Sequence, residues 1–168
     1  MTVRPTPDRL REALFNVLAP RIEGKVFLDA YAGSGAVGIE ALSRGAKRVF
    51  FIERNAQALG VIRENLRSLE IETEATVVRG SAAALLRNYD SDIAFVDPPY
   101  LDAGEYANSL LALAQTNCPL VIAQHESRIA LEERYGALEK TRVLKQGDNS
   151  LTFYEQRPAN PPAKRERP

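Results

Sequence analysis

The sequence contains few of the residues on which disulfide-bonded and metal-binding proteins depend. Its 168 residues include one cysteine, one histidine and no tryptophan. A single cysteine excludes an internal disulfide and is typical of a cytoplasmic protein. Cys118 and His125 are too few ligands for a zinc site, so we expect no structural metal.

Long apolar runs and net charge are also missing. No run approaches the roughly 18 residues of a membrane-spanning helix, and the first residues, MTVRPTPDRL, lack the apolar core of a signal peptide. We therefore predict a cytoplasmic protein with no membrane partner. The formal net charge is zero, which argues against a nucleic-acid binder held mainly by charge, although both ends of the chain are locally basic.

Short apolar runs alternate with amphipathic segments through most of the chain. The runs KVFLDA, RVFFIE, EATVVRG, DIAFVD and PLVIAQH predict strands separated by helices, and residues 128–135 are a further candidate helix. This alternation predicts an α/β fold with a mostly parallel sheet and helices on both faces. ALEKTRVLKQG and NSLTFYEQ flank a turn at residues 147–149, which predicts a closing antiparallel pair. We expect a single domain over residues 1–156, followed by a disordered basic tail at residues 157–168 that is rich in proline and charge.

A glycine-rich turn follows the first predicted strand. Residues 33–38 read G-S-G-A-V-G, which matches the G-x-G-x-x-G fingerprint of dinucleotide-binding folds. In those folds a pyrophosphate sits on the N-terminus of the next helix. Here Asp29 lies four residues before the first glycine, and its carboxylate would face a pyrophosphate unfavourably. An acidic group at this place suits a cationic ligand, such as the ammonium group of an amino acid.

A second acidic residue, Glu53, ends the second predicted strand, 20 residues after Gly33. A carboxylate at this position can accept hydrogen bonds from both hydroxyls of a ribose, in nicotinamide and in S-adenosylmethionine (AdoMet) proteins alike. Glu53 and the glycines therefore predict an adenosine cofactor, and Asp29 favours AdoMet over a nicotinamide.

The motif Asp97-Pro98-Pro99-Tyr100 directly follows the fourth predicted strand. Two prolines stiffen the loop and leave carbonyl groups without a neighbouring N–H. The Asp97 carboxylate and the Pro98 carbonyl can together accept hydrogen bonds from one exocyclic amine, and Tyr100 offers a ring on which a flipped base can stack. Because ligands of such sheets bind beyond the carboxyl ends of the strands, Asp29, Glu53 and Asp97 should share one rim.

D-P-P-Y is the catalytic motif of AdoMet-dependent methyltransferases that act on exocyclic amines of nucleobases. With RPTPDRLREALFNVL, LDAYAGSGAVGIEALSRGA and GDNSLTFYEQR, the chain resembles the bacterial 16S rRNA guanine-N2 methyltransferase family of the RsmD type. The resemblance covers residues 4–157. It implies a Rossmann-like class I methyltransferase fold, with a seven-stranded, mostly parallel sheet and an antiparallel C-terminal strand. It also implies AdoMet as the cofactor, 16S rRNA within a small-subunit assembly particle as the partner, and a monomer.

The resemblance also assigns roles to individual positions. Asp97, Pro98, Pro99 and Tyr100 would form the catalytic loop. The cofactor would be bound by Asp29, Tyr31, Ala32, Gly33, Ser34, Gly35, Glu53, Arg54, Gly80, Ser81 and Ala82. Arg4, Thr6, Arg9 and Arg11 would contact RNA or close over the cofactor, as part of an N-terminal segment at residues 1–24. Family members usually carry a basic β-hairpin before this block, whereas three residues precede Arg4 here. The resemblance therefore leaves open how the RNA is bound.

Three other functions remain compatible with the residues. The same D-P-P-Y chemistry serves an adenine-N6 methyltransferase acting on DNA or RNA. A nucleic-acid-binding module could hold AdoMet without turnover. A nicotinamide-dependent oxidoreductase is the third alternative, because the glycine fingerprint is shared.

Overall fold

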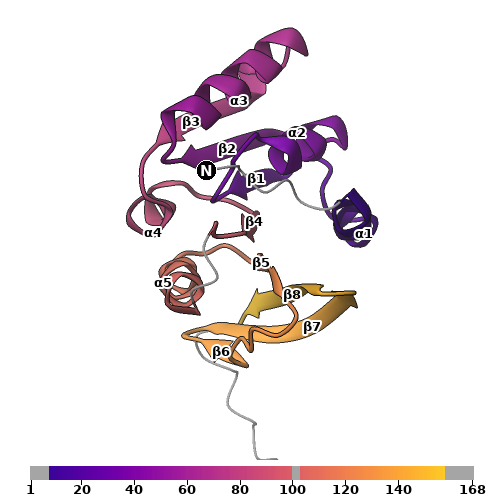
Figure 1. Ribbon diagram of the computed structural model, residues 1–168, viewed down its shortest axis with the longest axis vertical. Coiled ribbons are helices and arrows are strands. Elements are labelled where there is room, and N and C mark those ends of the chain that lie inside the picture. The colour runs from indigo at the N-terminus through magenta and orange to yellow at the C-terminus, as the bar shows by residue number, and fades with distance from the viewer. Residues whose placement is uncertain (1–7, 100–102, 158–168) are drawn as a thin grey trace, which may run out of the picture.

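The computed structural model describes residues 8–99 and 103–157. Its helices and strands follow one another in the order predicted for an α/β chain (Figure 1). The elements are α1 Asp8–Leu18, β1 Val26–Asp29, α2 Ala36–Ser43, β2 Arg48–Glu53, α3 Ala56–Ser68, β3 Ala75–Arg79, α4 Ala82–Leu85, β4 Ile93–Val96, α5 Ala103–Ala114, β5 Leu120–Glu126, β6 Arg134–Tyr135, β7 Leu138–Gln146 and β8 Asn149–Gln156, with 3-10 turns at Glu72–Glu74 and Leu86–Asn88.

All the strands belong to one sheet, in the order β3-β2-β1-β4-β5-β8-β7-β6. Strands β1 to β5 pair in parallel, whereas β8 runs antiparallel to both β5 and β7. The predicted fold class and the closing antiparallel pair are therefore confirmed. The sheet has eight strands where seven were predicted, because the two-residue β6 adds an edge by pairing with β7. The candidate helix at residues 128–135 is wrong for the same reason, since this segment forms turns and then β6.

Helices cover both faces of the sheet, as predicted. Figure 1 shows α1 and α2 on one side and α4 and α5 on the other. Leu14 and Phe15 of α1 and Ile62 of α3 bury their side chains against Phe27 and Phe95 on the first face. Tyr106, Leu110 and Leu113 of α5 pack against the alternate residues of β4 and β5 on the second face. The side chains of each strand alternate between the two faces because a strand has a period of two residues. With helices covering both faces, the carboxyl ends of the strands form the open edge.

Some predictions fall on residues outside the described ranges. Arg4, Thr6 and Tyr100 are among them, as is most of the predicted tail, residues 158–168. Arg157, the first residue of that tail, donates a backbone hydrogen bond of 2.7 Å to the Ala137 carbonyl and forms an ion pair with Glu139.

Two features are absent from the described part of the chain. Within residues 8–99 and 103–157, no helix combines the length and hydropathy needed to cross a bilayer. Across the same residues, no three His, Cys, Asp or Glu side chains are grouped so that they could hold a metal ion.

Candidate active site

A cleft of about 1390 Å³ opens at the carboxyl ends of β1, β2, β4 and β5. β1 lies between β2 and β4, so the strand order reverses between β1 and β4. Doubly wound sheets bind their ligands in the crevice at this point, beyond the carboxyl ends of the strands. The volume exceeds the roughly 300–1,000 Å³ of a typical small-molecule pocket, which leaves room for a cofactor and a base together. Most of the predicted cofactor residues line this cleft: Asp29, Tyr31, Ala32, Gly33, Ser34, Glu53, Arg54, Gly80, Ser81 and Ala82.

The glycine turn is fixed to both neighbouring strands. Ala30 donates its backbone N–H to the Phe95 carbonyl at 3.0 Å, and Ala32 donates to the Ile52 carbonyl at 2.9 Å. Gly33 and Gly35 have φ of 56° and 85°, values at which a side chain would be strained, so glycine is required for this path. Gly35 belongs to the turn but is not among the residues that line the cleft.

The two carboxylates at the strand ends accept hydrogen bonds from this turn and its helix. Glu53 Oε1 accepts from the Gly33 amide at 2.9 Å, and its Oε2 accepts from the Asn55 amide at 2.8 Å. Asp29 Oδ2 accepts from the Gly38 amide, inside the first turn of α2, at 3.1 Å. Backbone donors that would face a pyrophosphate in a nicotinamide protein are thus already paired with carboxylates. This pairing argues against a dinucleotide and fits a cationic ligand.

Asp29 is nearly inaccessible to solvent, with 1% of its surface exposed. Burial raises its pKa to about 7, the hydrogen bond from Gly38 partly opposes the rise, and the nearby charges of Asp97 and Glu53 add to it. Burial disfavours the charged form of a carboxyl group, and so does a neighbouring negative charge. A cation bound beside Asp29 would relieve both effects. The prediction that these three carboxylates share one rim is confirmed, since all three line the cleft.

The residues of the cleft fit AdoMet. Its methionine end carries an ammonium and a sulfonium group, which suit the acidic floor formed by Asp29 and its neighbours. Each oxygen of Glu53 accepts one backbone hydrogen bond and keeps a further lone pair for a ribose hydroxyl. Ser81 precedes α4 without capping it through its side chain, and it lines the cleft beside Gly80.

Tyr31 links the glycine turn to α5 through hydrogen bonds of its hydroxyl group. Its Oη donates to Glu105 Oε2 at 3.1 Å and lies 2.5 Å from Ser109 Oγ. Burial raises the pKa of Tyr31 to about 12, so the ring stays neutral. The contact sets the position of α5 relative to the turn.

Asp97, Pro98 and Pro99 are the described residues of the predicted catalytic loop. They follow β4 directly and line the same cleft as the glycine turn. Asp97 contributes to the raised pKa of Asp29, so the two carboxyl groups lie within electrostatic reach of each other. A methyl donor held over Asp29 and an amine held by Asp97 would therefore meet inside one cleft.

The far wall of the cleft was not foreseen from the sequence. It is built from the end of β5, from α5 and from the β7–β8 turn, and includes Glu105, Tyr106, Gln124, His125, Glu126, Ser127, Arg128, Lys145, Gly147, Asp148 and Asn149. The sequence marked only the turn at residues 147–149, which was expected to join an antiparallel pair and not to line the site. For Gln124 and His125 the available signal was that PLVIAQH ends a parallel strand, so both had to reach the same edge as Asp97.

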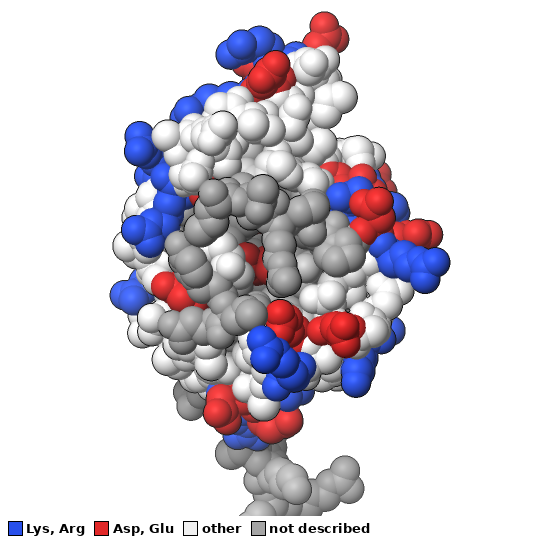
Figure 2. Space-filling view, in the orientation of Figure 1, with Lys and Arg blue, Asp and Glu red and all other residues white. Residues whose placement is uncertain are grey.

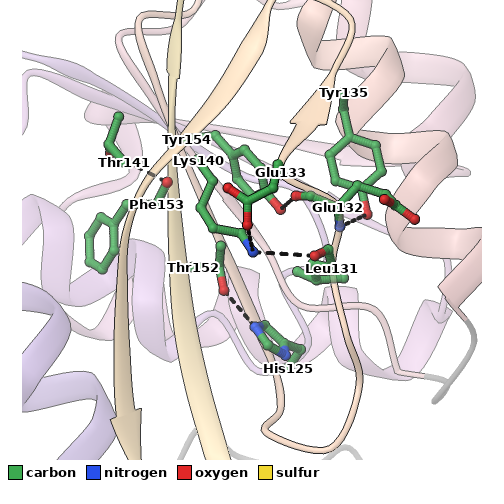
Figure 3. Close-up of polar contacts among 10 residues, drawn as sticks. All are labelled: His125, Leu131, Glu132, Glu133, Tyr135, Lys140, Thr141, Thr152, Phe153 and Tyr154. Atoms are coloured by element: carbon green, nitrogen blue, oxygen red, sulfur yellow. Dashed lines mark hydrogen bonds and ion pairs between the residues drawn. The ribbon is translucent and has the colours of Figure 1, made fainter.

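The ring of His125 is fixed on this wall by hydrogen bonds, one of them to Thr152 of β8 (Figure 3). Its Nδ1 donates to the Glu126 carbonyl at 2.8 Å, so its Nε2, 2.6 Å from Thr152 Oγ1, accepts from that hydroxyl. Burial lowers its pKa, which keeps the ring neutral. Nearby, Tyr154 Oη donates to the Glu132 carbonyl at 2.7 Å, which holds the segment after β5 against β8.

The described arginines of the predicted RNA-binding segment lie on α1. Arg9 is exposed, and Arg11 forms an ion pair of 3.2 Å with Asp8. Neither lines the cleft. On the face drawn in Figure 2, basic side chains are spread around the outline and acidic ones lie among them, so the described residues form no continuous basic patch there.

The strand order, the acidic ends of β1 and β2 and the Asp-Pro-Pro loop after β4 define a class I AdoMet-dependent methyltransferase. The chain belongs to the family described as Conserved hypothetical protein 95, whose model matches residues 1–155. The resemblance noted in the sequence is confirmed by this match.

Individual relatives agree with it. YlbH of Bacillus subtilis is 34% identical over 166 residues, which cover 93% of this chain and 89% of YlbH. Ribosomal RNA small subunit methyltransferase D is 41% identical over 115 residues in Haemophilus influenzae, covering 65% of this chain and 60% of that protein. In Escherichia coli the protein of that name is 44% identical over 100 residues, covering 58% of this chain and 50% of the relative.

Solved structures show the same fold. The Escherichia coli protein yhhF superposes with a TM-score of 0.82 at 31% identity, over 92% of this chain and 89% of that one. An RNA methyltransferase of Salinibacter ruber, solved with S-adenosyl-L-homocysteine, superposes with a TM-score of 0.74 at 14% identity, over 95% and 97%. At that identity the second likeness concerns the fold alone.

Proposed function

We propose that this protein transfers a methyl group from AdoMet to the exocyclic N2 amine of a guanine in 16S rRNA. One observation carries the proposal: the Asp97-Pro98-Pro99 loop and the glycine turn with Glu53 line the same cleft. The names of the relatives from Haemophilus influenzae and Escherichia coli support the small-subunit rRNA as the target polymer. The substrate is then a small-subunit assembly particle in the cytoplasm, and the enzyme acts as a monomer.

One set of residues in the cleft binds the cofactor and another set binds the target base. AdoMet supplies a methyl group on a sulfonium centre. Asp29 and the Gly33–Gly35 turn hold the methionine end, Glu53 holds the ribose, and Arg54, Ser81 and Ala82 flank the adenine. Asp97 and the Pro98 carbonyl accept the two hydrogens of the target amine, which aims the nitrogen lone pair at the methyl group.

Asp97 acts through charge and position. The amine becomes cationic as it takes the methyl group, and a fixed carboxylate beside it stabilises that charge. The proton then leaves to Asp97 or to water. Positioning supplies most of the remaining acceleration, because donor and acceptor are held in line with water excluded. Arg9 and Arg11 of α1 contact phosphates of the RNA outside the cleft.

The test is to identify the modified nucleoside. The protein is incubated with AdoMet carrying an isotopically labelled methyl group and with unmethylated small subunits, naked 16S rRNA or DNA, and the digested nucleosides are analysed by mass spectrometry. We expect labelled N2-methylguanosine from the rRNA. Labelled N6-methyladenosine would instead make it an adenine methyltransferase, and AdoMet binding without any product would make it a binding module.

Two variants connect the product to the site. Asp97→Ala should abolish methylation while AdoMet still binds by calorimetry. Asp90→Asn changes an exposed carboxylate outside the cleft and should methylate like the wild type. A fully active Asp97→Ala protein would contradict the assignment.

A further inference from the structure

One buried oxygen atom on the far wall of the cleft lacks a hydrogen-bond partner. Gln124 is 6% exposed, and its side-chain oxygen Oε1 is the buried polar side-chain atom without a partner among the residues that the structure describes. Buried polar groups in native proteins are nearly always paired, and leaving one unpaired costs stability. An exception of this kind inside a ligand-binding cleft indicates that the ligand supplies the missing partner.

The position of Gln124 places this acceptor beside the catalytic loop. β4 and β5 are parallel neighbours, and their last register pair is Val96 with Ala123. Asp97 directly follows β4 and Gln124 is the next residue of β5, so the two residues are neighbours at the carboxyl edge, where adjacent strands are about 4.8 Å apart. Both residues line the cleft.

The side chain of Gln124 leaves the sheet on the face of α2. Side chains alternate along a strand, and Ile122, two residues earlier, belongs to the same buried cluster as Val37 of α2. Asp97 lies within electrostatic reach of Asp29, whose carboxylate accepts from Gly38 on that face, and of Tyr106.

The backbone of Gln124 is held firmly. Its carbonyl accepts a hydrogen bond of 2.6 Å from Tyr106 Oη, and its strand pairs with Leu151 of β8 on the other side. An acceptor fixed in this way is preorganised for a donor that arrives beside Asp97.

We propose that Gln124 Oε1 accepts a hydrogen bond from the ring N1–H of the target guanine and so selects guanine over adenine and cytosine. This inference rests on the proposed function, because it assumes that Asp97 and Pro98 hold the exocyclic amine. In guanine the N2 amine has a ring N–H donor next to it. In adenine and cytosine the ring nitrogen beside the amine carries no hydrogen and is itself an acceptor, so it would face Oε1 unfavourably. Enzymes that flip bases read them through such contacts on the Watson–Crick edge.

A base analogue removes the donor of this contact. 2-Aminopurine keeps the exocyclic amine of guanine but lacks both the hydrogen on N1 and the O6 carbonyl, so the change in preference between wild type and variant reports the contact with Gln124. The rRNA substrate is assembled by ligation with the target guanosine intact or replaced by 2-aminopurine, and kcat/KM is measured for the wild type and for Gln124→Met, which keeps the length of the side chain and removes the acceptor. The wild type should prefer guanine roughly 10- to 100-fold. Gln124→Met should methylate guanine more slowly by a similar factor and should show little preference.

Two controls separate this role from a structural one. Gln115→Met changes an exposed glutamine after α5 and should keep the wild-type preference. The affinity of Gln124→Met for AdoMet should equal that of the wild type, because the residue faces the base. An equal preference for guanine in wild type and Gln124→Met would overturn this inference and leave the proposed function standing. Absence of any N2-methylguanosine from the wild type would overturn the proposed function and this inference with it.

Discussion

Glu53 Oε1 accepts a hydrogen bond of 2.9 Å from the amide of Gly33, which fixes the acidic end of β2 to the turn after β1. The carboxylate that should bind the ribose and the turn that should cradle the methionine end are thus parts of one rigid unit. Its other oxygen accepts from the Asn55 amide at 2.8 Å, so the orientation of the carboxylate is set before any ligand arrives.

Glu53→Gln should weaken AdoMet binding. A glutamine has one acceptor oxygen, so one of the two amides would face an NH2 group, and the ribose would lose a charged acceptor. Hydrogen bonds to charged groups contribute about 1.5–3 kcal/mol each, so we expect Kd to rise roughly 10- to 100-fold by calorimetry. Glu40→Gln, which breaks a surface ion pair on α2, should leave Kd unchanged. Equal affinities for wild type and Glu53→Gln would show that Glu53 does not touch the cofactor.

Asp29 should make the cofactor-free protein less stable as the pH rises. Its pKa is raised from 3.8 to about 7 in the folded protein, so between these values the folded state holds a proton that the unfolded state has lost. The stabilising contribution of that proton is complete below about pH 4 and is lost as the pH rises to 7. Asp29→Asn cannot ionise, so its stability relative to the wild type should increase by roughly 2–4 kcal/mol from pH 4.5 to pH 8. Urea unfolding at the two pH values measures this, and an equal difference at both would contradict the role of ionisation.

Binding of AdoMet should release a proton from Asp29 near pH 7. A cation beside the carboxylate favours the charged form and lowers its pKa, so the affinity should rise as the pH is raised from 6 to 7. Calorimetry in two buffers with different ionisation enthalpies counts the protons released. Asp29→Asn serves as the control for titration of the ligand's own amino group, and it should release fewer protons than the wild type. The same proton count for both would remove Asp29 from the binding site.

The third glycine of the fingerprint should be required for packing. A Cβ atom on Gly38 would lie 2.3 Å from Cε1 of Phe51 and 2.9 Å from Cγ1 of Val49, both of which are buried. Gly38→Ala should therefore destabilise the protein by about 1–3 kcal/mol or more through overpacking. The matched control is Gly60→Ala in α3, where nothing lies within 4 Å of the new atom, and there the higher helix propensity of alanine should stabilise by up to about 1 kcal/mol. Thermal unfolding compares the two, and changes of the same sign would contradict this explanation.

The fold class and one side of the site could be predicted from the sequence because local rules determine them. Alternating runs gave a parallel sheet, whose strands end at a common edge, and Asp29, Glu53 and Asp97 each follow or end such a strand. The turn at residues 147–148 carried its own signal, with Gly147 at a φ of 61°. The edge strand β6 was missed, since Arg134 and Tyr135 form a strand only through their pairing with β7.

The sequence by itself determined the class of cofactor and predicted the place of the reaction, since those features depend on residues within a few positions of a strand end. Only the tertiary structure determined the burial, the neighbouring charges and the hydrogen-bond partners of each side chain. The raised pKa of Asp29 comes from burial and from charges at the carboxyl ends of two other strands. Gln124 Oε1 is buried without a partner in the folded chain, on a strand that lies between β4 and β8. Burial and pairing of this kind depend on contacts between residues far apart in the chain, which no local pattern records.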